Sequence, residues 1–186
     1  GGEEVLGALV RARADLDRAS KSGYRAIELC VVNGRAASAA ALLAARASVG
    51  NTASGLNPLH AAGAFGSGRE VVTMLLGARA SPNDRFRPAN FPIWCFITIF
   101  GLSYRLGSRA SSSALWYHSR DATPLMFALV RGWSAEALAM LEHGADCSMR
   151  NARGADAEAL AKAFGMYPLV AAALGPKHSI PGTLVV

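Results

Sequence analysis

The sequence predicts an all-α protein built from repeated pairs of helices. Similar segments recur at a steady interval along the chain. They open at positions 26, 58, 92, 124 and 157, with separations of 32, 34, 32 and 33 residues. Four further segments align without gaps, and their shared column holds Arg13, Arg46, Arg79 and Gly144. Apolar residues in these segments recur at helical spacing. A period near 33 residues over the whole chain indicates a repeat architecture.

The first helix of a unit has a recognisable start and end. Pro58 and Pro124 suit the first helical position, because proline has a preset φ and lacks an N–H that would be unpaired there. Asn57 and Thr123 precede them and can cap the free N–H groups. Glycine after the helix supplies a left-handed residue that ends it. The glycines in this column are Gly34, Gly66, Gly132 and Gly165.

These residues resemble the ankyrin-repeat family. Residues 57–62 (NPLHAA) and 123–128 (TPLMFA) match the family's T-P-L-H-x-A signature, and Gly144-Ala145-Asp146 matches its closing motif. The resemblance extends from Glu3 to about Leu174. It implies a solenoid of units with a turn and two antiparallel helices. It also implies that His60 bonds between neighbouring turns and has a structural role.

The resemblance divides the chain into units in order. These are a half repeat at 3–19, repeats at 20–52 and 53–86, a degenerate apolar repeat at 87–118, a repeat at 119–151, a capping repeat at 152–178 and a tail at 179–186. Ala26 and Ala157 replace proline in the two end units, as expected of caps. Arginine replaces the late glycine at 13, 46 and 79. We expect each of these arginines to adopt left-handed backbone angles, which lowers stability by about 1 kcal/mol per residue. The initial half unit implies further repeats upstream.

The middle unit departs most from the pattern. We expect Pro92 to open a helix, Gly101 to end it, residues 102–106 to form a short second helix and residues 108–122 to form a long turn. Three interpretations of residues 91–104 stay open: a buried helix flanked by units on both sides, an exposed aromatic patch that docks a partner, or aberrant sequence. The β-branched residues of this stretch also allow a strand.

Composition excludes several classes of protein. The 186 residues are 52% hydrophobic and 17% charged, which is too apolar for a disordered chain. The net charge of +6 favours acidic partners, whereas the scattered arginines argue against specific nucleic-acid binding.

Cys30, Cys95 and Cys147 lack the spacing of a disulfide framework or a metal site, which favours an intracellular, reducing compartment. A removed targeting segment is compatible with the sequence. The apolar run at 91–100 is about half the length of a bilayer-spanning helix.

No catalytic motif is apparent. The histidines lack metal-ligand spacing, and residues 111–113 (SSS) lack a nucleophile elbow. Residues 63–68 (GAFGSG) lack the Lys-Ser/Thr ending of a phosphate-binding loop. We therefore predict that the chain is not an enzyme and that it uses no cofactor.

The sequence thus predicts a scaffold that binds a partner protein through its concave face and turn tips. Arginine beside aromatic residues is typical of interface cores. The candidate contact residues are Arg85, Phe86, Arg87, Trp94, Trp116, Tyr117, His118, Arg120, Arg150 and Arg153. One alternative is a structural subunit of a larger complex, docked through the aromatic repeat and touching a membrane only indirectly. Another is the targeting part of a longer enzyme.

Overall fold

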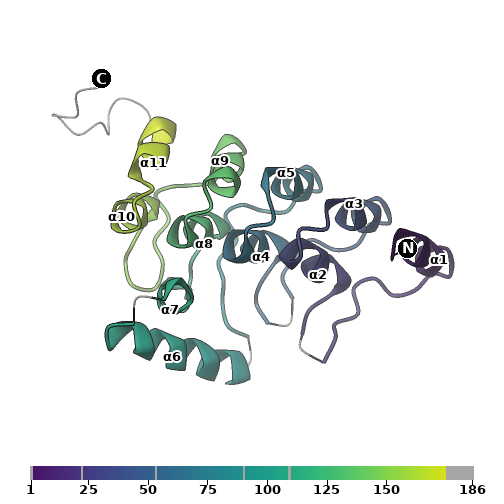
Figure 1. The fold of residues 1–186 in the computed structure, drawn as a ribbon, viewed down its shortest axis with the longest axis horizontal. Coiled ribbons are helices and arrows are strands. Elements are labelled where there is room, and N and C mark those ends of the chain that lie inside the picture. The colour runs from purple at the N-terminus through teal and green to yellow at the C-terminus, as the bar shows by residue number, and fades with distance from the viewer. Residues whose placement is uncertain (1, 22, 53, 90, 109, 175–186) are drawn as a thin grey trace.

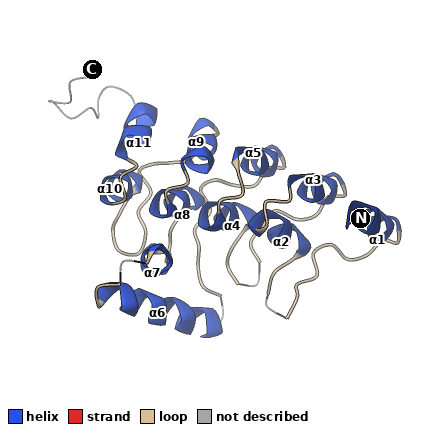
Figure 2. Cartoon of the chain, in the orientation of Figure 1, coloured by secondary structure: helices blue, strands red, loops and turns tan. Residues whose placement is uncertain are grey.

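The protein is all-α over the part that the structure describes. The computed structural model describes residues 2–21, 23–52, 54–89, 91–108 and 110–174. These residues form eleven helices and no strand (Figure 2). The helices are α1 (Gly2–Arg11), α2 (Ala26–Val32), α3 (Ala36–Ala44), α4 (Pro58–Phe65), α5 (Arg69–Gly77), α6 (Phe91–Arg105), α7 (Ser111–His118), α8 (Pro124–Arg131), α9 (Ser134–Glu142), α10 (Ala157–Ala163) and α11 (Tyr167–Leu174).

Nine of the helices lie in two rows. Helices α2, α4, α8 and α10 pack side by side in the first row, and α1, α3, α5, α9 and α11 form the second row (Figure 1). Each first-row helix contacts the second-row helix that follows it in the chain. The short links between them are those of antiparallel helix hairpins. The main core cluster lies between the rows and includes the buried Leu59, Leu75, Leu125 and Met140.

The helix starts confirm the predicted caps. Asn57 Oδ1 accepts the backbone N–H of His60 at 2.9 Å, and Thr123 Oγ1 accepts that of Met126 at 3.4 Å. Gly66 and Gly132 end α4 and α8 in the left-handed region, with φ of 75° and 76°. The late-column residues Arg13, Arg46 and Arg79 also have left-handed φ, of 55°, 64° and 67°, as predicted.

Four turns before the first-row helices share one pattern of two backbone hydrogen bonds. The N–H of the first residue donates to the carbonyl of the last, and the residue before the last donates back to the carbonyl of the first. The first and last residues are Ser20 and Tyr24, Thr52 and Leu56, Phe86 and Ala122, and Asn151 and Ala155, with N···O distances of 2.7–2.9 Å. The residue that donates back has positive φ in each turn. These residues are Gly23, Gly55, Asp121 and Gly154, with φ of 84°, 87°, 54° and 77°.

The third of these turns contains a long insertion. Its two hydrogen-bonded ends, Phe86 and Ala122, stand 36 positions apart, whereas the ends of the other three turns stand four apart. The turn therefore holds 32 additional residues, the length of segment 87–118. Both closing bonds, Phe86 N–H to Ala122 O and Asp121 N–H to Phe86 O, measure 2.9 Å. The insertion thus leaves from a turn whose base is intact.

The insertion corrects the interpretation of residues 91–104 as a buried helix flanked by units on both sides. Helix α4 packs directly on α8, and α5 packs on α9. Helix α6 packs on α7, and this pair lies below α8 in Figure 1, outside the two rows. The sequence interval through position 92 suggested a repeat at 87–118. The inserted segment is almost as long as one period, so the segments that follow it keep the spacing of about 33 residues.

The boundaries of α6 and α7 also differ from those expected. Helix α6 continues through Gly101 to Arg105, and residues 111–118 form a helix instead of a turn. A Cβ at position 101 would stand 3.5 Å from the Cα of Tyr117, an ordinary contact distance, so α6 and α7 pack against each other at this point. The rings of Tyr104 and Tyr117 pack together at a tilt of 37°, with centroids 4.9 Å apart. The continued helix thus packs its last turns against α7.

The strained turn residue Asp121 provides a test of the common turn pattern. We expect Asp121→Gly to stabilise the protein by about 1 kcal/mol, because positive φ costs a non-glycine residue about 1–2 kcal/mol and the greater freedom of unfolded glycine offsets part of that gain. Loss of the exposed Arg87–Asp121 ion pair should matter little. Urea denaturation checks this, with Asp121→Ala as a control that should not stabilise. A lower midpoint for the glycine variant would contradict the assignment.

The structure also describes the apolar helices and the three cysteines. Among the described residues, no helix combines the length and the apolar character needed to cross a membrane. Cys30, Cys95 and Cys147 are partly buried and unpaired. Burial raises the pKa of the Cys30 and Cys147 thiols, which keeps both protonated and weakly reactive at neutral pH.

Candidate functional site

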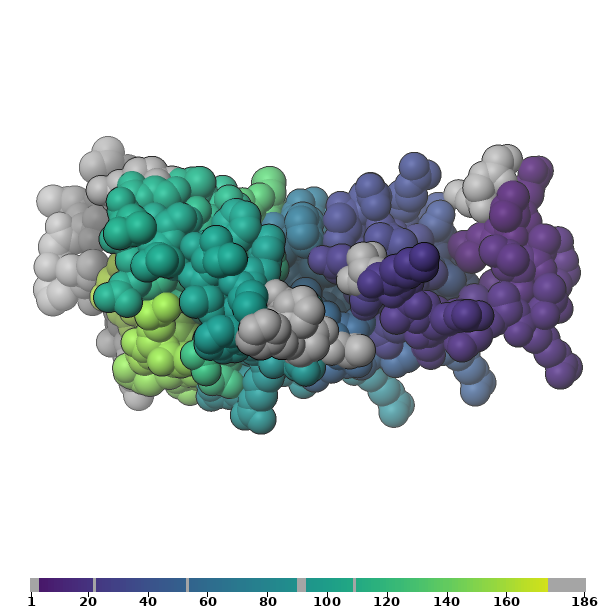
Figure 3. Space-filling view, turned by 90° about the horizontal axis from the view of Figure 1, so that it is seen from below, coloured from purple at the N-terminus to yellow at the C-terminus, as the bar shows by residue number. Residues whose placement is uncertain are grey.

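A groove between α6 and α7 collects half of the predicted contact residues. Its volume is about 270 Å³. It is lined by Trp94, Ile97, Thr98, Gly101, Leu102, Arg105, Trp116, Tyr117, Arg120 and Arg153. We call this the aromatic groove. Figure 3 views the molecule from below and shows the teal surface of the segment around α6 standing forward near one end.

One face of α6 forms a wall of the aromatic groove. Trp94, Thr98, Leu102 and Arg105 follow one another at spacings of three or four residues, so they share a face of the helix. Trp94 is 46% exposed and Leu102 is 52% exposed. Large apolar side chains at this exposure are open to a partner.

Helix α7 supplies the opposite wall, and its rings are held in place. The ring of Trp116 meets that of Phe96 edge-on, with centroids 5.1 Å apart. The Tyr117 ring packs against that of Tyr104 at a tilt of 37°, and the Arg153 guanidinium lies 3.5 Å from the centre of the Tyr117 ring. Arg153 Nε also donates to the Tyr117 carbonyl at 2.6 Å. The aromatic wall is therefore ordered before any partner arrives, which lowers the entropic cost of binding.

Three arginines give the aromatic groove its charge. Arg105, Arg120 and Arg153 are exposed, and none of them forms an ion pair with a carboxylate among the described residues. The Ala152 N–H donates to the Arg120 carbonyl at 2.9 Å, which holds the backbone of Arg120 beside that of Arg153. No acidic side chain lines the groove. Its net charge is therefore positive.

His118 supports the groove from behind without adding to its charge. Its ring contacts Tyr104, Tyr117 and Phe164. Burial, and then the charge of Arg153, lowers the pKa of His118 to about 4. The ring is therefore neutral at pH 7. Its carbonyl accepts the Asn151 side-chain N–H at 3.1 Å, which ties α7 to the turn before α10.

The structure separates the remaining predicted contact residues from the groove. Arg85 and Arg87 line a different hollow of about 340 Å³, where Arg85 donates to the Arg150 carbonyl at 2.6 Å. Arg87 pairs with Asp121 at 3.2 Å, and Arg150 pairs with Asp156 at 3.1 Å. These arginines do not rim the aromatic groove.

The prediction that Phe86 contacts a partner is wrong. Its side chain is fully buried, and its ring packs against His60 and Phe127 with centroids 6.1 and 5.8 Å away. It therefore cannot contact a partner at a turn tip. The backbone of Phe86 bonds to that of Asp121 and Ala122 at the base of the turn.

Sequence reasoning missed four side chains of the groove: Ile97, Thr98, Leu102 and Arg105. Their spacing from Trp94 along one helix was the available signal. For Leu102 and Arg105 this signal is masked by the prediction that the helix ends at Gly101, whereas Ile97 and Thr98 lie within the predicted helix.

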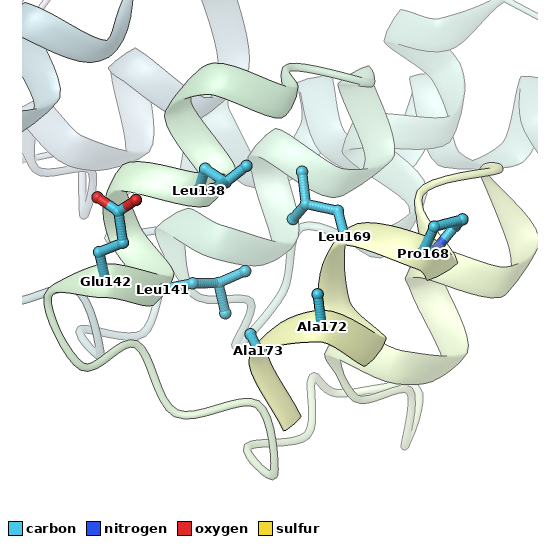
Figure 4. A pocket seen from close by; sticks show the side chains of 7 residues that line it. All are labelled: Leu138, Leu141, Glu142, Pro168, Leu169, Ala172 and Ala173. Atoms are coloured by element: carbon cyan, nitrogen blue, oxygen red, sulfur yellow. The ribbon is translucent and has the colours of Figure 1, made fainter. Parts of the chain in front are cut away.

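A second, larger hollow lies between α9 and α11 (Figure 4). It measures about 580 Å³ and is lined by Leu138, Leu141, Glu142, Pro168, Leu169, Ala172 and Ala173. It offers an apolar surface with a single carboxylate and no ring. Its chemistry is therefore less selective than that of the aromatic groove.

No family model matches the chain, and no curated protein matches it.

Among the described residues, no group of three or more potential metal ligands comes together. The aromatic groove presents ring faces, aliphatic surface and guanidinium groups. Such groups bind a partner by packing and charge, without an evident proton-transfer pair.

Proposed function

We propose that the chain is an ankyrin-repeat scaffold without catalytic activity, and that a partner protein docks in its aromatic groove. The two rows of helices, the capped starts of α4 and α8, and the shared turn pattern support the repeat assignment. His60 supports it further, because its Nε2 donates to the Ala122 carbonyl of the next turn at 3.2 Å. Stacked units of this kind present extended binding surfaces.

The docking proposal rests mainly on the aromatic groove, where aromatic rings of the insertion lie beside three exposed arginines that have no carboxylate partner among the described residues. Tryptophan, tyrosine and arginine are the residues most enriched in binding hot spots. The rows of helices close without the insertion, since α4 and α8 pack directly on each other. A segment that lies outside the rows, and that displays such side chains, is best explained by a binding role.

A structural subunit of a larger complex is the second candidate. Ile99 and Leu106 are 66% and 80% exposed, and neither lines the aromatic groove. A permanent assembly would bury this additional apolar surface. In this case the chain would purify only together with its partners.

Photo-crosslinking from the groove tests the docking proposal. Thr98 lines the groove, and Thr73 on α5 is a matched control. Both are exposed, and both donate their hydroxyl to a carbonyl four residues earlier, at 2.8 and 2.9 Å. We expect a photoreactive residue at 98 to yield a discrete crosslinked protein in cells, and the same residue at 73 to yield none.

Selectivity decides the outcome of that experiment. The crosslink from position 98 should disappear when Trp94→Ala is added and persist when Leu138→Ala is added, because Leu138 is also exposed but lies on α9. Equal labelling from both threonine positions, or a crosslink insensitive to Trp94, would refute docking in the groove.

A further inference from the structure

The aromatic groove brings three arginines together without an acidic side chain. Arg87 and Arg150 at the neighbouring turn tips are already paired with Asp121 and Asp156. Arg105, Arg120 and Arg153 line the groove and have no carboxylate partner among the residues that the structure describes. A guanidinium group pairs most strongly with a carboxylate or phosphate, often through two parallel hydrogen bonds.

The size of the groove limits what can enter it. Its volume of about 270 Å³ falls below the range of pockets that hold drug-sized ligands, which is about 300–1,000 Å³. It suits one large apolar side chain of a partner. The walls on either side are the Trp94 indole and the Trp116 and Tyr117 rings, which favour an aromatic or aliphatic anchor.

We propose that the aromatic groove binds an acidic peptide segment in which one aromatic or aliphatic anchor is flanked by carboxylates. The anchor enters between α6 and α7, and the carboxylates meet the three groove arginines. The inference rests on the docking function proposed above and specifies the chemistry of the partner. It is favoured over single-stranded nucleic acid, because a nucleic acid requires a basic track along several phosphates and the neighbouring arginines are neutralised.

Fluorescence anisotropy with synthetic peptides tests the inference on the intact chain. The probe is a fluorescein-labelled peptide with one phenylalanine flanked on both sides by pairs of glutamates. Three matched probes replace the phenylalanine with serine, replace the glutamates with glutamines, or substitute an oligouridylate. We expect the first probe to bind and the serine and glutamine probes to bind about tenfold more weakly or worse.

Variants of the protein locate the binding. Arg105→Glu combined with Arg120→Glu should weaken the acidic probe about tenfold or more, because the change reverses two charges that face it. Arg18→Glu, at an exposed arginine far from the groove in the chain, is the control and should have a much smaller effect. Raised salt should weaken the acidic probe more than the glutamine probe.

The outcomes separate this inference from the docking proposal. Equal binding of the acidic and glutamine probes, no binding of any peptide, or tighter binding of the oligouridylate would each overturn an acidic partner. Docking in the groove would still stand if the crosslink from Thr98 persisted in the presence of Leu138→Ala and vanished with Trp94→Ala. Loss of that selective crosslink would remove the docking function itself.

Discussion

A chain that lacks residues 87–118 is expected to keep its two rows of helices and to lose completely its binding of the partner that crosslinks to position 98 of the full chain. The deletion joins Phe86 to Ser119 and gives the turn the same length as the turns at 20–24, 52–56 and 151–155. It removes all of α6 and α7, and with them the aromatic groove. Circular dichroism should show helical structure with cooperative unfolding, and the partner identified by crosslinking from position 98 of the full chain should no longer co-purify with the shortened chain.

Two opposing effects act on the stability of this variant. The deletion uncovers part of Met126 and Phe127, which pack in a cluster with Leu115 of α7. It also shortens a long loop, which removes a closure cost of about 2 kcal/mol. Deleting residues 100–131 is the control of equal length, because it removes α8 from the first row. If the 87–118 deletion unfolds the chain as that control should, the segment is an integral part of the core and the insertion assignment is wrong.

Acidification is expected to reduce the free energy of unfolding by about 3 kcal/mol through His60 alone. Burial lowers the pKa of this histidine from 6.5 to about 4, although the Ala122 carbonyl and Asp84 act to raise it. The unfolded chain binds the proton near pH 6.5, whereas the folded chain resists it down to pH 4. The contribution of neutral His60 is therefore complete above pH 6.5 and is lost as the pH falls from 6.5 to 4.

Urea denaturation at pH 7 and at pH 4 checks this effect. Because carboxylates also titrate in this range, the decisive quantity is the pH-dependent difference between the wild type and His60→Asn. That variant should show a shallower loss of stability on acidification, whereas an exposed-site variant such as His143→Asn should follow the wild type. Parallel profiles for wild type and His60→Asn would show that His60 does not carry the pH dependence.

Much of the helical framework follows from local features of the sequence. Pro58, Asn57 and Gly66 fix the start and end of α4, because a preset φ, a capping oxygen and a left-handed glycine act within a few residues of one another. The same local chemistry defines α8. Ala26 and Ala157 open α2 and α10 at the expected positions without proline.

The arrangement of α6, α7 and the aromatic groove was decided only by tertiary structure. A period counts residues along the chain, so an insertion of nearly one period leaves the count intact while moving the segment out of the rows. The hydrogen bonds from Phe86 to Asp121 and Ala122 join residues too distant in sequence for any local pattern to predict. They bury Phe86, which the sequence placed at a turn tip. Helix α6 packs on α7 and continues past Gly101. That continuation brings Arg105 to the groove beside Trp94 and Trp116.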